Sequence, residues 1–71
     1  MYKVAIISCG MIASSAHIPA YKAYPDRYEI VAVCDVNAEL AEKTAKEHGI
    51  ACYYTDAEEM LRAHNPDVVS V

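Results

Sequence analysis

The hexapeptide Ser8-Cys9-Gly10-Met11-Ile12-Ala13 is the part of this 71-residue sequence whose residue types point most directly to chemistry. It follows a short apolar run, precedes a stretch with helical character, and matches two of the three positions of the pattern G-x-G-x-x-G/A. In that pattern the second glycine, here Gly10, lets the backbone approach a pyrophosphate, and the last small residue, here Ala13, lets a helix pack closely on a strand. The helix N-terminus then binds the anion through its N–H groups and its dipole. Ser8 replaces the first glycine, and an ordinary strand-to-helix turn is the alternative interpretation.

A second feature is the acidic residue Asp35, which directly follows the apolar run Tyr28–Cys34. A carboxylate at the end of the second strand can accept hydrogen bonds from both hydroxyls of an adenosine ribose, and it repels a 2′-phosphate. The alternative is a helix N-cap or a loop residue. Together, the turn and the carboxylate in one βαβ unit predict NAD binding and disfavour NADP.

Strand and helix patterns must alternate along the chain to position these residues. Asn37 and Gly49 are expected to cap the second helix, Thr55 and Glu58 to form a capping box on the third, and Pro19 to kink or split the first. The order βαβαβαβ predicts an α/β fold with a Rossmann-type parallel sheet. Strands are expected at Lys3–Ser8, Tyr28–Cys34, Cys52–Tyr54 and Asp67–Val71, and helices at Met11–Ala23, Ala38–His48 and Asp56–Ala63.

Composition excludes several classes of protein. Hydrophobic residues make up 55% of the sequence, which is too apolar for a disordered chain. The net charge of −4 favours neither nucleic acid nor an anionic membrane as a partner. The apolar runs are far shorter than the roughly 20 residues of a membrane-spanning helix. No signal peptide is recognisable, and we expect a cytoplasmic location.

Cysteine and histidine spacing argues against a metal site. The three cysteines form no Cys-x-x-Cys pair, and each stands in or beside an apolar run, so we expect buried, reduced thiols. The histidines His17, His48 and His64 belong to three different expected helices and share no ligand spacing with a cysteine.

Several stretches, taken as a set, resemble the N-terminal part of the Gfo/Idh/MocA oxidoreductases, which include glucose–fructose oxidoreductase and inositol dehydrogenase. The resemblance implies a Rossmann domain that binds a nicotinamide cofactor, followed in the full protein by an α/β domain that holds the substrate. The stretches are Ala5–Ala13, His17–Ala20, Ile30–Asp35, Tyr54–Leu61 and Pro66–Val71.

The resemblance also implies the roles of individual residues. The expected cofactor contacts are Ser8, Gly10, Met11 and Ile12 at the pyrophosphate turn, Asp35 at the adenosine ribose, Asn37 at the adenine, and Ser70 and Val71 at the end of the fourth strand. The family's catalytic lysine lies in a Glu-Lys-Pro motif after the fourth strand, so no catalytic residue is expected within this chain. Glu42-Lys43 is followed by Thr44 and is not that motif.

We therefore expect residues 1–71 to be the N-terminal part of a dinucleotide-binding domain, an incomplete one, with the rest of that domain and the substrate domain beyond Val71. The complete enzyme, expected to be a homo-oligomer, would transfer a hydride between nicotinamide and a hydroxyl-bearing carbon of a sugar or cyclitol. Two other functions fit the same residues. One is a non-catalytic NAD-binding regulatory protein, and the other is a methyltransferase that uses S-adenosylmethionine, which has no pyrophosphate to bind.

Overall fold

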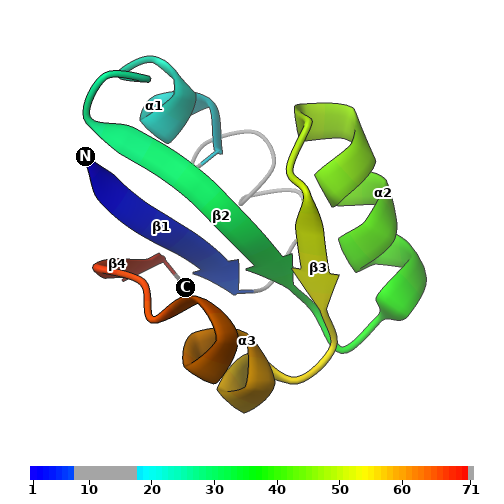
Figure 1. Ribbon diagram of the computed structural model, residues 1–71. Coiled ribbons are helices and arrows are strands. Elements are labelled where there is room, and N and C mark those ends of the chain that lie inside the picture. Colours follow the sequence, from blue (N-terminus) through cyan, green and yellow to red (C-terminus); the bar gives the residue numbers. More distant parts are fainter. Residues whose placement is uncertain (8–17, 71) are drawn as a thin grey trace.

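The computed structural model describes residues 1–7 and 18–70, which form a four-stranded parallel sheet with helices on both faces (Figure 1). The strands lie in the order β3-β2-β1-β4, so the predicted Rossmann-type sheet and the βαβαβαβ order are confirmed. The elements in chain order are β1 (Tyr2–Ile7), α1 (Ile18–Lys22), β2 (Tyr28–Cys34), α2 (Ala38–His48), β3 (Cys52–Tyr54), α3 (Ala57–His64) and β4 (Val68–Ser70).

Strand β1 is buried on both faces along Val4–Ile6, where the side chains are completely buried. Val4 and Ile6 pack on the face that α1 and α2 cover, where Ile18 is also completely buried. Ala5 lies on the other face, against Met60 of α3. A segment buried on both faces needs an unbroken apolar run, which Val4–Ile7 supplies.

One register shift interrupts the pairing of the two central strands. Ile30 of β2 pairs with Val4 of β1, but the next paired residues are Ala32 and Ala5, so Val31 is an extra residue in β2. Val31 and Ala32 consequently both pack on the α3 side of the sheet. Every later residue of β2 therefore lies on the face opposite to the one that strict alternation from Ile30 would give.

Helix α2 has the bounds and both caps that the sequence predicts. The Asn37 Oδ1 atom accepts a hydrogen bond of 3.2 Å from the backbone N–H of Leu40. At the other end Gly49 has φ +68°, and its N–H donates to the carbonyl of Ala45. This left-handed conformation closes the helix without the backbone strain that an L-residue would have at a positive φ.

The predicted start of α3 is wrong by one residue. The N-cap is Asp56, whose Oδ1 atom accepts a hydrogen bond of 3.0 Å from Glu58 N–H, and the helix begins at Ala57. Thr55 therefore does not cap this helix. A carboxylate at the cap interacts with the helix dipole as well as with the N–H group, which favours aspartate over threonine there.

The edges of other elements also differ slightly from expectation. Strand β1 begins at Tyr2 rather than at Lys3, and α3 ends at His64 rather than at Ala63. Strand β4 is Val68–Ser70, while Asp67 binds Lys3 of β1 through its backbone N–H and its carboxylate. Helix α1 is described from Ile18 onward, so the expected break at Pro19 is tested only on its C-terminal side. No helix among the described residues is long and apolar enough to cross a membrane.

The positive φ of Gly49 leads to a prediction about the stability of the fold. We expect Gly49→Ala to lower the free energy of unfolding by about 1 kcal/mol, because an L-residue is strained at positive φ. No atom lies within 4 Å of the added Cβ, so steric collision contributes nothing. Gly49→Asn should cost less, since asparagine tolerates this region, as Asn65 does at φ 42° at the end of α3. Denaturant unfolding of both variants checks this, and equal stability of wild type and Gly49→Ala would contradict it.

The thiols partly match the expected buried, reduced state. Cys34 is buried, Cys52 is half-buried and neither forms a disulfide bond, while Cys9 lies outside the described residues. Burial raises the pKa of the Cys34 thiol above its ordinary value, and the carboxylates of Asp35 and Asp56 raise it further. The thiol is therefore protonated in the folded protein at neutral pH.

This raised pKa predicts a loss of stability in alkaline solution. The unfolded thiol ionises at about pH 8.5 and the folded thiol only at a higher pH. The contribution of Cys34 to the free energy of unfolding is therefore intact below about pH 8.5 and falls above it. The free energy of unfolding should thus decrease more steeply above about pH 8.5 in the wild type than in Cys34→Ala. Denaturant titrations of both proteins between neutral and alkaline pH measure the difference. Parallel curves would contradict the prediction.

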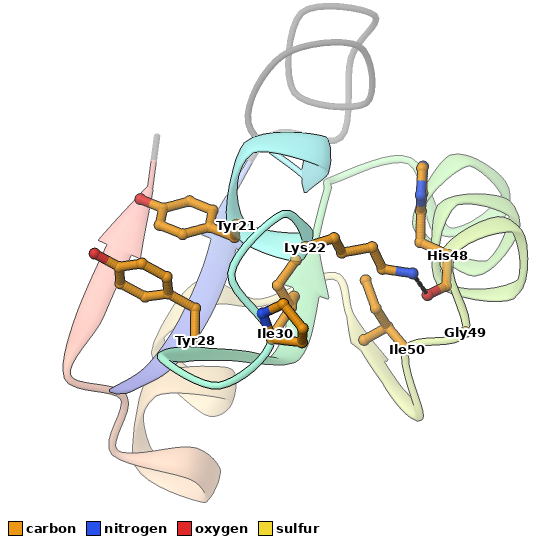
Figure 2. A pocket seen from close by; sticks show the side chains of 8 residues that line it. Tyr21, Lys22, Tyr28, Ile30, His48, Gly49 and Ile50 are labelled. Carbon is orange, nitrogen blue, oxygen red and sulfur yellow. Dashed lines mark hydrogen bonds between the residues drawn. The ribbon is translucent and has the colours of Figure 1, made fainter. Parts of the chain in front are cut away.

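A hollow of about 340 Å³ lies at the amino-terminal edge of the sheet, between the ends of α1 and α2 and the start of β2 (Figure 2). Ile30 and Ile50 line it, and the Lys22 side chain runs across to donate a hydrogen bond to the carbonyl of His48. A cation at the C-terminal end of a helix is favourable because it meets the negative end of the dipole. Ligands of parallel α/β sheets bind at the opposite, carboxyl edge, so this hollow is not the expected cofactor site.

Candidate cofactor-binding site

Two of the predicted site residues flank the end of β1. Cys34 pairs with Ile7, which brings Asp35 to the carboxyl edge on one side of β1, and Ser70 pairs with Ile6 on the other side. The chain builds β2 and β3 on one side of β1 and then returns to place β4 on the other side. Such a switch point is where open parallel sheets bind nucleotides. Asp35 and Ser70 are therefore separated by roughly two strand spacings, or about 10 Å, across this point.

Asp35 is held in place by two backbone contacts. Its own N–H donates to the carbonyl of Tyr54 at 3.0 Å, which extends the β2–β3 ladder by one rung beyond Cys34. Its Oδ1 atom accepts a hydrogen bond of 2.8 Å from the backbone N–H of Asn37. The residue is half-buried. The carboxylate is thus oriented by the turn that leads into α2, which restricts its rotamers before any ligand arrives.

The register shift in β2 sets the alternation that leads to Asp35. Val33 packs on the side of α1 and α2, and Cys34 packs on the side of α3. Asp35 directly follows the strand, and continued alternation predicts the parity of Val33 for it.

The predicted role of Asn37 is constrained by its position as a helix cap. Its side-chain oxygen is engaged with the N–H of Leu40, and the residue is exposed. A contact with adenine would therefore come from the amide NH₂ group. The other predicted contacts, Ser8, Gly10, Met11, Ile12 and Val71, lie outside the described residues and stay predictions.

Tyr54 contacts Asp35, although the sequence analysis gives Tyr54 no role in the site. Its carbonyl holds Asp35, and its hydroxyl lies 2.8 Å from Nε2 of His64. Burial raises the pKa of the Tyr54 hydroxyl, with smaller contributions from Cys52 and Glu59, so this hydroxyl is protonated at neutral pH. No motif links Tyr54 to Asp35, because the contact depends on the pairing of β2 with β3.

The sequence predicts neither a catalytic residue nor a metal site in this chain, and both stay predictions. Lys43 is exposed on α2, and its Nζ atom lies 4.0 Å from Oε1 of Glu47. Within residues 1–7 and 18–70, no three histidine, cysteine or acidic side chains gather in a way that could hold a metal ion.

Fold and strand-end geometry define a nucleotide-binding domain of the doubly wound α/β class. The family model described as an oxidoreductase family with an NAD-binding Rossmann fold matches residues 2–71. The chain belongs to this family, the Gfo/Idh/MocA oxidoreductases. The sequence-based assignment of family and fold is thereby confirmed, and the family is one of NAD-binding oxidoreductases rather than methyltransferases.

Similar proteins include two sugar dehydrogenases and a solved complex with NADH. D-glucoside 3-dehydrogenase of Escherichia coli strain K12 is 42% identical over 69 residues, which are 97% of this chain and 19% of that enzyme. D-apiose dehydrogenase of Paraburkholderia graminis is 36% identical over 70 residues, 99% of this chain and 18% of that enzyme. The WlbA dehydrogenase of Bordetella pertussis, solved with NADH and UDP-GlcNAcA, superimposes with a TM-score of 0.85 at 29% identity, covering 96% of this chain and 20% of that structure.

These figures define what this chain shares with its relatives. It spans about a fifth of their length. The family, the fold and the NAD-binding class are established from this shared fifth alone.

Proposed function

We propose that this chain is the NAD-binding part of a dehydrogenase that moves a hydride between nicotinamide and a hydroxyl-bearing carbon of a sugar or cyclitol. The observation that carries the proposal is Asp35, a carboxylate oriented by two backbone contacts at the nucleotide edge of the sheet. The sugar dehydrogenases among the relatives support the class of substrate. The catalytic lysine or histidine is proposed to lie in the part of such enzymes that this chain does not match.

Within this proposal the described residues bind and orient the cofactor. Asp35 accepts hydrogen bonds from the two hydroxyls of the adenosine ribose, because an ionised carboxylate offers two acceptor oxygens in the required plane. A 2′-phosphate in the same place would bring two negative charges together, which disfavours NADP. Bound NAD supplies the hydride-accepting carbon, and the protein supplies position and electrostatics.

The first test replaces the proposed ribose ligand. In the full-length protein, Asp35→Ser should weaken NADH binding by about tenfold or more, because hydrogen bonds to a charged group are among the strong ones. The same change should raise the affinity for NADPH relative to NADH. Calorimetric dissociation constants for both cofactors measure the two effects.

A matched control separates the local role of Asp35 from general charge. Asp56→Asn removes another carboxylate near Cys34 while keeping an oxygen that can cap α3. It should leave the NADH-to-NADPH ratio unchanged. An unchanged ratio in Asp35→Ser, or an equal change in Asp56→Asn, would contradict the assignment of the ribose ligand.

The second test concerns the proposed pyrophosphate turn. Gly10→Val should abolish NADH binding, because a branched side chain would fill the space into which the pyrophosphate must come. Ser8→Gly should change the affinity by less than about tenfold, since Gly10 can adopt the unusual backbone angles of the turn. Calorimetry on both variants decides. Normal NADH binding by Gly10→Val would show that the phosphate turn lies elsewhere.

A further inference from the structure

Strand β3 is a three-residue edge strand that two tyrosine hydroxyls fix to helices on opposite faces of the sheet. The hydroxyl of Tyr53 donates a hydrogen bond of 2.9 Å to Oε2 of Glu42 on α2. The next residue, Tyr54, makes its 2.8 Å hydrogen bond with Nε2 of His64 at the end of α3. A strand this short has few ladder hydrogen bonds of its own, so such side-chain contacts contribute a large share of its order.

The two tyrosines differ in how firmly they are held and in what their backbones contact. Tyr53 is 43% exposed, and its main chain pairs with Val33 inside the ladder. Tyr54 is half-buried and packs on the α3 side of the sheet. Its ring stands edge-on to the His64 ring, with centroids 5.5 Å apart and an interplanar angle of 79°. Tyr54 is thus fixed by ring packing and by a hydrogen bond, and it is the tyrosine that contacts Asp35.

The contact between Tyr54 and Asp35 connects this anchor to the proposed ribose site. The Asp35 N–H donates to the Tyr54 carbonyl at 3.0 Å, on the rung that follows the Cys34–Tyr54 pair. A change in the position of the Tyr54 main chain therefore moves the Asp35 main chain, and the carboxylate moves with it. A carboxylate that accepts hydrogen bonds from two adjacent hydroxyls at once tolerates little displacement. The residues that hold its main chain in place therefore affect how well it binds the ribose.

We propose that the Tyr54–His64 pair is a positioning device for Asp35, so that His64, at the far end of α3, contributes to cofactor affinity and to the preference for NAD over NADP. The inference rests on the proposed function, in which Asp35 binds the adenosine ribose. Tyr54 and His64 act through Asp35 and need no contact with the cofactor. A purely structural role would change the stability of the fold and leave the cofactor preference as it is.

The experiment is a double-mutant cycle in the full-length protein, with calorimetric dissociation constants for NADH and NADPH. Tyr54→Phe removes one hydroxyl and keeps the ring, and it should weaken NADH binding by about threefold and lower the NADH-to-NADPH preference. His64→Leu, which removes the partner of that hydroxyl, should likewise weaken NADH binding and lower the preference for NADH. His64→Gln, whose amide nitrogen can occupy the place of Nε2, should restore most of the affinity.

Two controls make the result specific. Tyr53→Phe is the same substitution on the neighbouring residue of the same strand. It should leave both dissociation constants within about 1.5-fold of wild type, because the Tyr53 hydroxyl bonds Glu42 of α2 and the Tyr53 main chain pairs with Val33 rather than with Asp35. In the Asp35→Ser background Tyr54→Phe should have no further effect on NADH binding, since the residue through which it acts is gone.

The outcomes distinguish this inference from the proposed function on which it rests. If Asp35→Ser weakens NADH binding but Tyr54→Phe does not, or if the two effects simply multiply, the positioning role is overturned and the ribose assignment stands. If Tyr53→Phe matches Tyr54→Phe, the effect belongs to strand stability and the inference fails. If Asp35→Ser changes neither dissociation constant, both proposals fail together.

Discussion

The pairing of β1 with β2, both buried between two layers of helices, is the constraint on which the rest of this structure depends. Side chains of these strands must be apolar and small enough to let α1 and α2 pack on one face and α3 on the other. Fully buried Ala5 and Ala32 meet this need on the α3 side, next to Met60. Because Val4–Ile6 and Ala32–Cys34 are buried, any change in register exposes or buries several residues at once, and the register is therefore strongly specified.

The single irregularity in that pairing changes which side chains the two faces of the sheet receive. The extra residue Val31 reverses the alternation of β2, so that Val33 packs with α1 and α2 and Cys34 packs with α3. The alternation that leads up to Asp35 is therefore set by the pairing of two strands, and bulges of this kind are frequent beside functional sites.

The two edges of the sheet have different chemistry. At the amino edge tyrosine rings pack on one another, with the centroids of Tyr21 and Tyr28 5.1 Å apart, and Lys22 bonds the end of α2. At the carboxyl edge the strands end in residues that hold one another through backbone contacts, with Asp35 between the turn into α2 and the end of β3. The main chain already orients the polar groups at this edge. A preorganised site of this kind loses little further side-chain entropy when a ligand binds.

The sequence by itself determined the order of elements, the parallel sheet and the bounds of β2, α2 and β3, because apolar periodicity, Asn37 and Gly49 are local signals that tertiary contacts here reinforce. It also located Asp35 at a strand end. Only the tertiary structure decided which residue caps α3, on which faces Val33 and Cys34 pack, and that Tyr54 contacts both Asp35 and His64. These depend on strand pairing and on contacts between distant segments, for which one-dimensional spacing holds no signal, because a one-residue shift in pairing reverses the face of every side chain that follows.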